Sequence, residues 1–280
     1  MCMLNRKIVA DSSCDVTVFP EAPFSLASLK ILTSEKEYVD DDQLDVAEMV
    51  DDLKNYSGRS STSCPNTQDW LDAFGDADEV FCVTITSNLS GAYNAAMTAK
   101  AAYEKEHPDR RVLVIDSLST GPEMLLIMEK IAEMIREERS FDEISNEIAH
   151  YQQHTGLLFM LESMNNLANN GRVSPVIAKV AGLLGIRVVG KASDVGTLEQ
   201  LNKCRGERKA LDTLVRHLKE LGFNGGKIRI GHCFNPGAAV ELKARILNQF
   251  EKARITIHEC RGLCSFYAEM GGLLLGFEKA

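Results

Sequence analysis

The sequence predicts an α/β protein with two lobes: an N-terminal, mainly parallel sheet with helices on both faces, and a C-terminal mixed α/β domain. In the first half, strand-like and helix-like patterns alternate with short connections. Beyond about residue 150, two strand patterns follow one another without a helix between them, which favours a mixed sheet. The length of 280 residues also exceeds the usual size of one domain. We place the lobes at residues 1–153 and 154–280.

The N-terminal elements follow from periodicity and turn residues. Val80–Ile85 is almost entirely apolar, as in a strand buried on both faces, and Val46–Asn55 has apolar residues at helical spacing. The polar stretch Ser57–Asn66 contains Gly58 and Pro65 and is predicted to be a loop. In this lobe we expect strands at Lys7–Asp11, Ser28–Leu32, Val80–Ile85 and Arg111–Asp116, and helices at Val46–Asn55, Thr67–Phe74, between Gly91 and His107, at Glu123–Arg139 and at Phe141–His150.

The C-terminal lobe mixes the same patterns in a different order. Gly190 and Gly196 are expected at the bend between two successive strands, and the polar segment Asn169–Arg172 is expected to be a turn. In this lobe we expect strands at Leu157–Met160, Ile186–Val189, Thr197–Lys203, Lys227–Cys233, Ile255–His258 and Leu273–Phe277, and helices at Pro175–Leu184, Glu207–Leu221 and Ala238–Phe250.

Charge and hydropathy exclude several classes of partner. The chain has 31 basic and 40 acidic residues and a net charge of −9, so it has no general attraction for nucleic acid or anionic lipid surfaces. The most apolar tract, Val173–Gly190, is interrupted by Lys179 and Arg187 and is not a membrane span. The N-terminus lacks the apolar run of a signal peptide. We therefore expect a soluble, cytoplasmic protein with no nucleic-acid partner and no integral membrane association.

Acidic residues and cysteines give no sign of a metal site. Asp40, Asp41 and Asp42 precede a predicted helix, and we expect them to lie in solvent near its positive end. The eight cysteines are scattered without a CxxC pair, so reduced thiols are expected. His258, Cys260 and Cys264 lie close in sequence, but a second ligand pair is missing. We expect neither a metal nor a cofactor.

Three segments rich in hydroxyl and glycine residues are candidates for binding, because open α/β sheets bind ligands where strands end. These segments are Asp11–Asp15, Ser61–Asn66 and Ser87–Gly91. Each could also be an ordinary turn. Ser90 is predicted at a helix start, where free N–H groups and the helix dipole favour a small anion such as a carboxylate. The alternative is that Ser90 simply caps its own helix.

Familiar catalytic motifs are missing from the sequence. It contains no GxxxxGKS, GxGxxG or GxSxG pattern. Two enzymatic alternatives remain open. The first is a lipid-ester hydrolase with Ser90 as nucleophile and a strand-end histidine, His232 or His258, as base. The second is a phosphatase with Asp11 as nucleophile and a magnesium ion. Hydroxyls without an assigned base suit binding better than catalysis, and no catalytic residue is assigned.

Taken together in order, the motifs resemble one known family, the DegV family of bacterial fatty-acid-binding proteins. That family includes the acyl-binding subunits that present fatty acids to a separate fatty-acid kinase. The resemblance extends over nearly the whole chain, and five segments in register carry it. They are Ile8–Asp15, Thr62–Pro65, Ile85–Tyr93, Val114–Ser117 and the GRVS motif in Asn170–Ser174, which the apolar tract Gly182–Val189 follows.

The resemblance implies a two-lobed carrier, not an enzyme, with one long acyl chain such as palmitate or stearate in a buried tunnel. Thr62 and Ser90 would hold the carboxylate between the lobes, with help from Ser63 and the backbone of Gly91. Arg172, in the GRVS motif, would serve in packing between the lobes or in contact with a partner. The implied partner is a fatty-acid kinase.

The C-terminal segment departs from the family pattern. Family members usually carry an HxGPG-type segment whose histidine reaches the carboxylate, whereas this chain reads YAEMGGLL from Tyr267 to Leu274. Tyr267 is placed near the missing histidine. A tyrosine can donate a hydrogen bond but carries no positive charge at neutral pH. Glu269, if it pointed inward, would repel a carboxylate.

Overall fold

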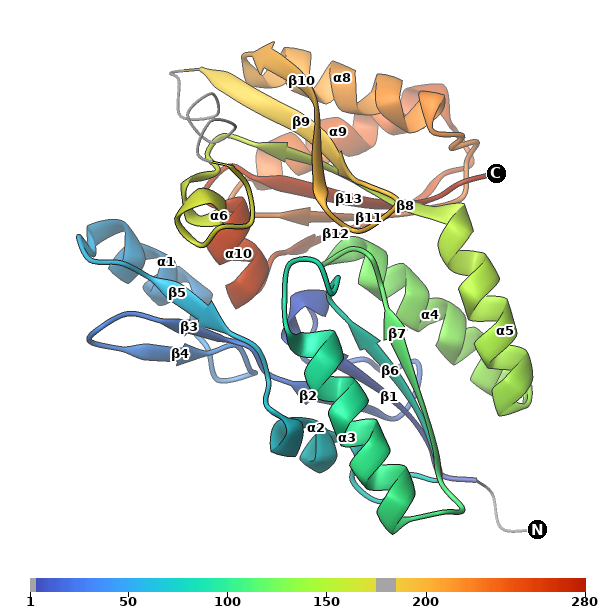
Figure 1. Ribbon diagram of the computed structural model, residues 1–280. Helices are drawn as coiled ribbons and strands as arrows, with labels where there is room; N and C mark the ends of the chain where they lie inside the picture. Colours follow the sequence, from blue (N-terminus) through green and yellow to red (C-terminus); the bar gives the residue numbers. More distant parts are fainter. Residues whose placement is uncertain (1–3, 175–184) are drawn as a thin grey trace.

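The computed structural model describes residues 4–174 and 185–280. One of its sheets, sheet A, is fully parallel and has the strand order β2-β1-β6-β7 (Figure 1). Its strands are β1 (Arg6–Asp11), β2 (Phe24–Ala27), β6 (Glu79–Thr84) and β7 (Arg111–Asp116). Every side chain of β6 is buried, in agreement with its apolar sequence.

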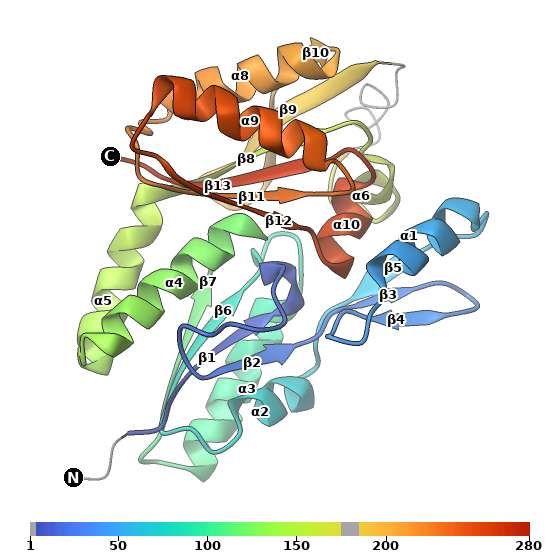
Figure 2. The same ribbon diagram turned by 180° about the vertical axis from the view of Figure 1, so that it is seen from behind.

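Helices cover both faces of sheet A, as predicted (Figures 1 and 2). On one face lie α2 (Thr67–Phe74) and α3 (Ala92–Glu106), and on the other lie α4 (Pro122–Arg136) and α5 (Phe141–Tyr151). Local sequence sets the start of α2, because the Asn66 side chain accepts from backbone N–H groups of the first turn while the Asp69 carboxylate accepts from the Asn66 N–H. The same capping box, from Ser140 and Glu143, starts α5.

The second half forms sheet C, a mixed six-stranded sheet with the order β10-β9-β8-β13-β11-β12. Its strands are β8 (Thr155–Leu161), β9 (Ile186–Ala192), β10 (Leu198–Arg205), β11 (Lys227–His232), β12 (Arg254–Glu259) and β13 (Leu273–Glu278). Helices α8 (Glu207–Glu220) and α9 (Pro236–Gln249) pack on one face. The α/β fold class with a parallel and a mixed sheet is therefore confirmed. The division of the chain at residues 153 and 154 stays a prediction.

Helix α4 lies between the two large sheets (Figure 2). It contacts β1 and β6 of sheet A and β8, β11 and β13 of sheet C, and its side chains are buried on both sides. Contact with sheet C is close at Gly276 of β13, where a Cβ atom would lie 2.5 Å from the carbonyl carbon of Pro122. The helix therefore belongs to the cores of both halves of the molecule.

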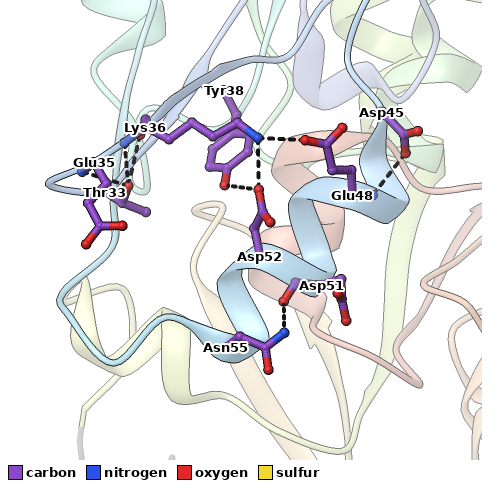
Figure 3. A network of polar contacts seen from close by, with 9 residues as sticks. All are labelled: Thr33, Glu35, Lys36, Tyr38, Asp45, Glu48, Asp51, Asp52 and Asn55. Carbon is purple, nitrogen blue, oxygen red and sulfur yellow. Dashed lines mark hydrogen bonds and ion pairs between the residues drawn. The ribbon is translucent and has the colours of Figure 1, made fainter.

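A small antiparallel sheet, sheet B, has the order β4-β3-β5. Its strands are β3 (Lys30–Leu32), β4 (Glu37–Val39) and β5 (Ser61–Ser63), and it packs with α1 (Val46–Asn55) and α10 (Gly262–Ala268). Figure 3 shows the polar side of this unit. The Lys36 ammonium lies 2.8 Å from both Glu48 Oε1 and Asp52 Oδ2, and the Tyr38 hydroxyl also donates to Asp52. This network joins α1 to the β3–β4 hairpin.

Several short elements differ from the prediction. The expected loop Ser57–Asn66 is wrong, because Ser61–Ser63 pairs with β3 as strand β5. The strand expected at Ser28–Leu32 is shorter, because β3 begins at Lys30, and the preceding strand β2, which belongs to sheet A, was not predicted. Strand β4, α6 (Asn165–Asn169), α10 and the 3₁₀ turns at Ser12–Cys14 and Gln152–His154 were not predicted. The helix expected at Pro175–Leu184 lies outside the described residues.

Two expected boundaries are also wrong. Helix α4 ends at Arg136 rather than Arg139. Gly190 lies inside β9, where a Cβ atom would come within 2.3 Å of the Phe159 ring, so close packing explains this glycine. Of the helices in residues 4–174 and 185–280, none is long and apolar enough to cross a membrane.

Gly196 lies at the turn between β9 and β10, where the hairpin meets the loop after β6. Its φ is +75°, and a Cβ atom there would lie 2.1 Å from Thr86 Oγ1. Next to it, the Asn88 amide donates to the Val195 carbonyl over 2.5 Å. The hairpin thus packs directly on sheet A's loops.

We expect Gly196→Ala to lower the free energy of unfolding by about 1–3 kcal/mol more than Gly222→Ala. Gly222 is a matched control, because its φ is +93° but no heavy atom lies within 4 Å of the position that a Cβ atom would take. Urea unfolding of both variants measures the difference. Equal losses in the free energy of unfolding would mean that Thr86 moves aside without a cost in stability.

Candidate functional site

A central cavity of about 330 Å³ lies between sheets A, B and C. This volume is within the range of small-molecule sites. The structure brings all six of the expected binding residues to its wall: Thr62, Ser63, Ser90, Gly91, Arg172 and Tyr267. They come from separate segments of the chain, so the fold gathers residues that the sequence keeps far apart. Their role in binding stays a prediction.

Thr62 and Tyr267 form the polar contact that joins sheet B to α10. Their hydroxyl oxygens are 2.7 Å apart, so one donates to the other. Burial raises the pKa of Tyr267, and its hydroxyl therefore keeps its proton at neutral pH. The hydroxyl that accepts within this pair keeps its own proton, which it can donate to a carboxylate.

Ser90 and Gly91 lie at the start of α3, which begins directly after Gly91. Ser90 Oγ accepts from the Ala92 N–H over 3.2 Å, but the N-cap residue of this helix is Gly91, and no side chain caps it. Because Oγ is the acceptor in that bond, its own proton remains available to a ligand. The local bond to Ala92 therefore leaves Ser90 free to donate to a ligand.

Arg172 supplies positive charge at the edge of the cavity. Its Nε donates to the Leu89 carbonyl over 3.1 Å, and its Nη1 donates to the Asn170 carbonyl over 2.6 Å. The guanidinium carbon lies 5.8 Å from the centre of the Tyr267 ring. Arg172 thus connects the loop that carries Ser90 with the turn after α6.

Glu269 does not face the cavity. Its Oε1 accepts from the Asn166 N–H over 3.0 Å, and it lines a different depression near α1 and β9. The Glu269 carboxylate therefore does not point into the central cavity, where it would repel the carboxylate of a ligand.

The rest of the wall is mainly apolar and was missed by sequence reasoning. Alternate residues of β8 point into the cavity, and residues from several other segments complete it. The β8 residues are Leu157, Phe159 and Leu161; the others include Leu29, Ile85, Leu89, Leu167, Leu198, Leu263, Ala268 and Leu274. Because β8 is apolar on both faces, its pattern does not indicate which face lines a cavity.

Two buried carboxylates position α10, which carries Tyr267. Asp40 was expected in solvent, but this was wrong, because it is 0% exposed and accepts from the N–H groups of Gly262 and Leu263 at 2.9 Å. Asp15 accepts from the Arg261 N–H at 2.8 Å. Burial raises the pKa of Asp40, and it raises that of Asp15 to about 7.

The segment Asp11–Asp15 supports the cavity from behind and does not line it. Asp11 Oδ2 accepts from the Ile85 N–H at 2.7 Å, and Ser12 Oγ accepts from the Leu29 N–H at 3.0 Å. Both bonds position residues whose side chains line the wall. Burial raises the pKa of Asp11 to about 6.

Histidines and metal ligands contribute nothing to the cavity wall that the structure describes. His232 and His258 are not among its lining residues, and burial lowers the pKa of His258 to about 4. Within residues 4–174 and 185–280, no group of three or more His, Cys, Asp or Glu side chains could hold a metal ion. The described cysteines are free thiols.

Comparison with known proteins identifies the family of this chain. The family model described as an uncharacterised protein of the DegV family matches residues 5–279. A DegV domain-containing protein of Streptococcus pneumoniae is 43% identical over 276 residues, which cover 97% of this chain and 98% of the relative. The chain therefore belongs to the DegV family, as its motifs predicted.

Several solved structures are similar to this chain in both sequence and fold. A DegV family protein from Eubacterium eligens, loaded with heptadecanoic acid, is 46% identical with a TM-score of 0.97, covering 98% of this chain and 100% of that one. The fatty acid kinase (Fak) B3 protein of Streptococcus pneumoniae, loaded with linoleic acid, is 42% identical with a TM-score of 0.97, covering 99% and 100%. A third, from Ruminococcus gnavus and refined with vaccenic acid, is 27% identical with a TM-score of 0.90, covering 98% and 100%.

Asp15 should make stability depend on pH. Its pKa is about 7 in the folded chain against 3.8 for a free carboxyl, so the folded state holds the proton more tightly. The stabilisation is complete below about pH 4 and is lost as pH rises toward 7, at up to about 1.4 kcal/mol per pH unit. We expect Asp15→Asn to flatten this fall in urea unfolding, since an amide oxygen still accepts from Arg261. A variant profile parallel to that of the unaltered protein would contradict the assignment.

Proposed function

We propose that this protein binds one long-chain fatty acid in the central cavity and presents it to a separate fatty-acid kinase. The observation that carries the proposal is the gathering of Thr62, Ser90, Arg172 and Tyr267 at one polar end of an otherwise apolar cavity. Relatives with 42% and 46% identity hold linoleic and heptadecanoic acid, and one of them is a Fak B3 protein.

The apolar wall supplies affinity for the chain. Each methylene removed from water contributes roughly 0.8 kcal/mol, so about 14–16 of them give on the order of 12 kcal/mol before ordering costs. Palmitate and stearate are chains of this size. Because this hydrophobic contribution is large, we expect the bound fatty acid to stay on the protein through purification.

The polar end supplies orientation. The carboxylate would accept from the hydroxyls of Thr62, Ser90 and Tyr267 and from the backbone at Gly91, with Ser63 beside them. These are neutral donors, and the cation nearest the ring of Tyr267 is Arg172, already bonded to two carbonyls. Such a set holds a carboxylate without pairing it with a fully available positive charge.

We propose a carrier without catalytic chemistry or a cofactor of its own. No histidine is among the described residues that line the cavity, so Ser90 has no base there. Asp11 is fully buried behind the wall, with both carboxylate oxygens bonded to neighbouring groups. A kinase that uses ATP would meet this carrier in the cytoplasm, and we propose that it works there.

Protein made in bacteria should contain one long-chain fatty acid per chain. Native mass spectrometry before and after delipidation measures the bound mass, and gentle solvent extraction identifies it. Repeatedly empty preparations that also fail to take up added fatty acid would refute the proposal. Labelling of Ser90 by a fluorophosphonate probe would instead favour a hydrolase.

Thr62→Val with Ser90→Ala should weaken fatty-acid binding by about ten- to a hundred-fold, because two hydrogen bonds to a charged group are lost. Fluorescence competition measures the affinity. Thr98→Val is a matched control, since Thr98 is exposed on α3 and bonds only its own helix. Unchanged affinity in a folded double variant would mean that the carboxylate lies elsewhere.

A further inference from the structure

Thr120 and Cys264 place two polar side chains in the otherwise apolar wall of the central cavity. Thr120 lies in the loop between β7 and α4, Cys264 lies in α10, and both line the cavity. Thr120 Oγ1 and Cys264 Sγ are 3.6 Å apart. The carboxylate site proposed above uses neither of these side chains, so their presence in this wall needs another explanation.

Three donors approach the backbone carbonyl oxygen of Ser13, which lies behind this pair. That oxygen accepts from the Gly121 N–H over 2.7 Å, which occupies one of its two lone pairs. Thr120 Oγ1 and Cys264 Sγ each lie 3.5 Å from the same oxygen. One lone pair therefore remains for two side-chain donors, and for an O–H or N–H donor a contact of this length is weak.

Thr120 Oγ1 is left without a strong donor. Burial raises the pKa of the Cys264 thiol, which therefore keeps its one proton at neutral pH. The Ser13 carbonyl and the neighbouring Asp15 carboxyl group both compete for that proton. Within the described parts of the chain, no hydroxyl, amide or charged group donates to Thr120 Oγ1. An oxygen in an apolar wall is costly unless some group supplies the missing hydrogen bond.

The pair lies on the part of the wall next to the carboxylate site. Cys264 is three residues before Tyr267 on α10, and residues at this spacing are neighbours on a helix surface, with Cβ atoms about 5–6 Å apart. Tyr267 belongs to the polar end of the cavity through its contact with Thr62. A substituent a few carbons from the carboxylate of a bound chain would therefore meet Thr120 and Cys264.

We infer that this protein accepts long-chain fatty acids that carry a hydroxyl group on the chain, and that Thr120 recognises this hydroxyl. The inference rests on the proposed function and specifies a substrate class for it. The ligand hydroxyl donates to Thr120 Oγ1, so both oxygens gain a partner. Against leucine and phenylalanine side chains alone, the same hydroxyl would lose its water and gain no hydrogen bond. The position of the hydroxyl on the chain therefore decides whether the ligand binds well.

The first test needs no variant. Competition binding to delipidated protein compares stearic acid with hydroxystearic acids whose hydroxyl occupies successive positions along the chain. Most positions should weaken binding by about ten- to a hundred-fold, because a buried hydroxyl without a partner is costly. One position near the carboxylate, or two neighbouring ones, should bind as tightly as stearic acid. A similar loss at every position would overturn the inference.

The second test removes the hydroxyl of Thr120. Thr120→Val keeps the shape of the side chain and should lower affinity for the favoured hydroxy acid by about ten-fold, while stearic acid binds at least as tightly as before. The ratio of the two affinities within one variant does not depend on the fraction of protein that is folded. Thr120→Ser retains a hydroxyl and should keep the preference.

Thr84→Val is the matched control. Thr84 is completely buried in β6, donates to the Ile115 carbonyl over 3.3 Å and does not line the central cavity. Its loss should leave the ratio of affinities unchanged. An unchanged ratio in Thr120→Val, or an equal change in Thr84→Val, would overturn the inference. A failure of the unaltered protein to bind stearic acid or any other fatty acid would instead refute the proposed function.

Discussion

The amino end of α10 is held by carboxylates from the first forty residues, and the polar end of the cavity depends on this contact. Asp40 accepts from two backbone N–H groups of α10, and Asp15 accepts from the N–H just before it. Burying a carboxylate is costly unless such donors replace water. A helix as short as α10 is not stable alone, so these bonds fix where Tyr267 meets Thr62.

This arrangement separates two tasks that a lipid carrier must combine. Much of the apolar wall comes from strands β8, β10 and β13 of the six-stranded sheet C. The polar groups come from short elements, β5, the start of α3 and α10, each fixed by a few hydrogen bonds. Affinity therefore resides in the core, and recognition of the head group resides in small units attached to it.

The long elements of the fold could be predicted from sequence, and the short ones could not. Helices α1 and α2 match their predicted limits because their apolar spacing and caps are local signals. Strand β5 and helix α10 escaped prediction because pairing with β3 and capping by Asp40 involve distant residues. The binding loops were recognisable by motif, whereas the apolar wall was not, since β8 is buried on both faces.

Helix α4 has a consequence for how a ligand enters and leaves. Sheets A and C both pack on it, and its contact with Gly276 leaves no room for an added carbon atom. Separating the two large sheets would expose apolar side chains of α4 to water on one side, at a large cost in free energy. The ligand should therefore enter and leave through local opening near β5, which is only half-buried, while sheets A and C stay packed on α4.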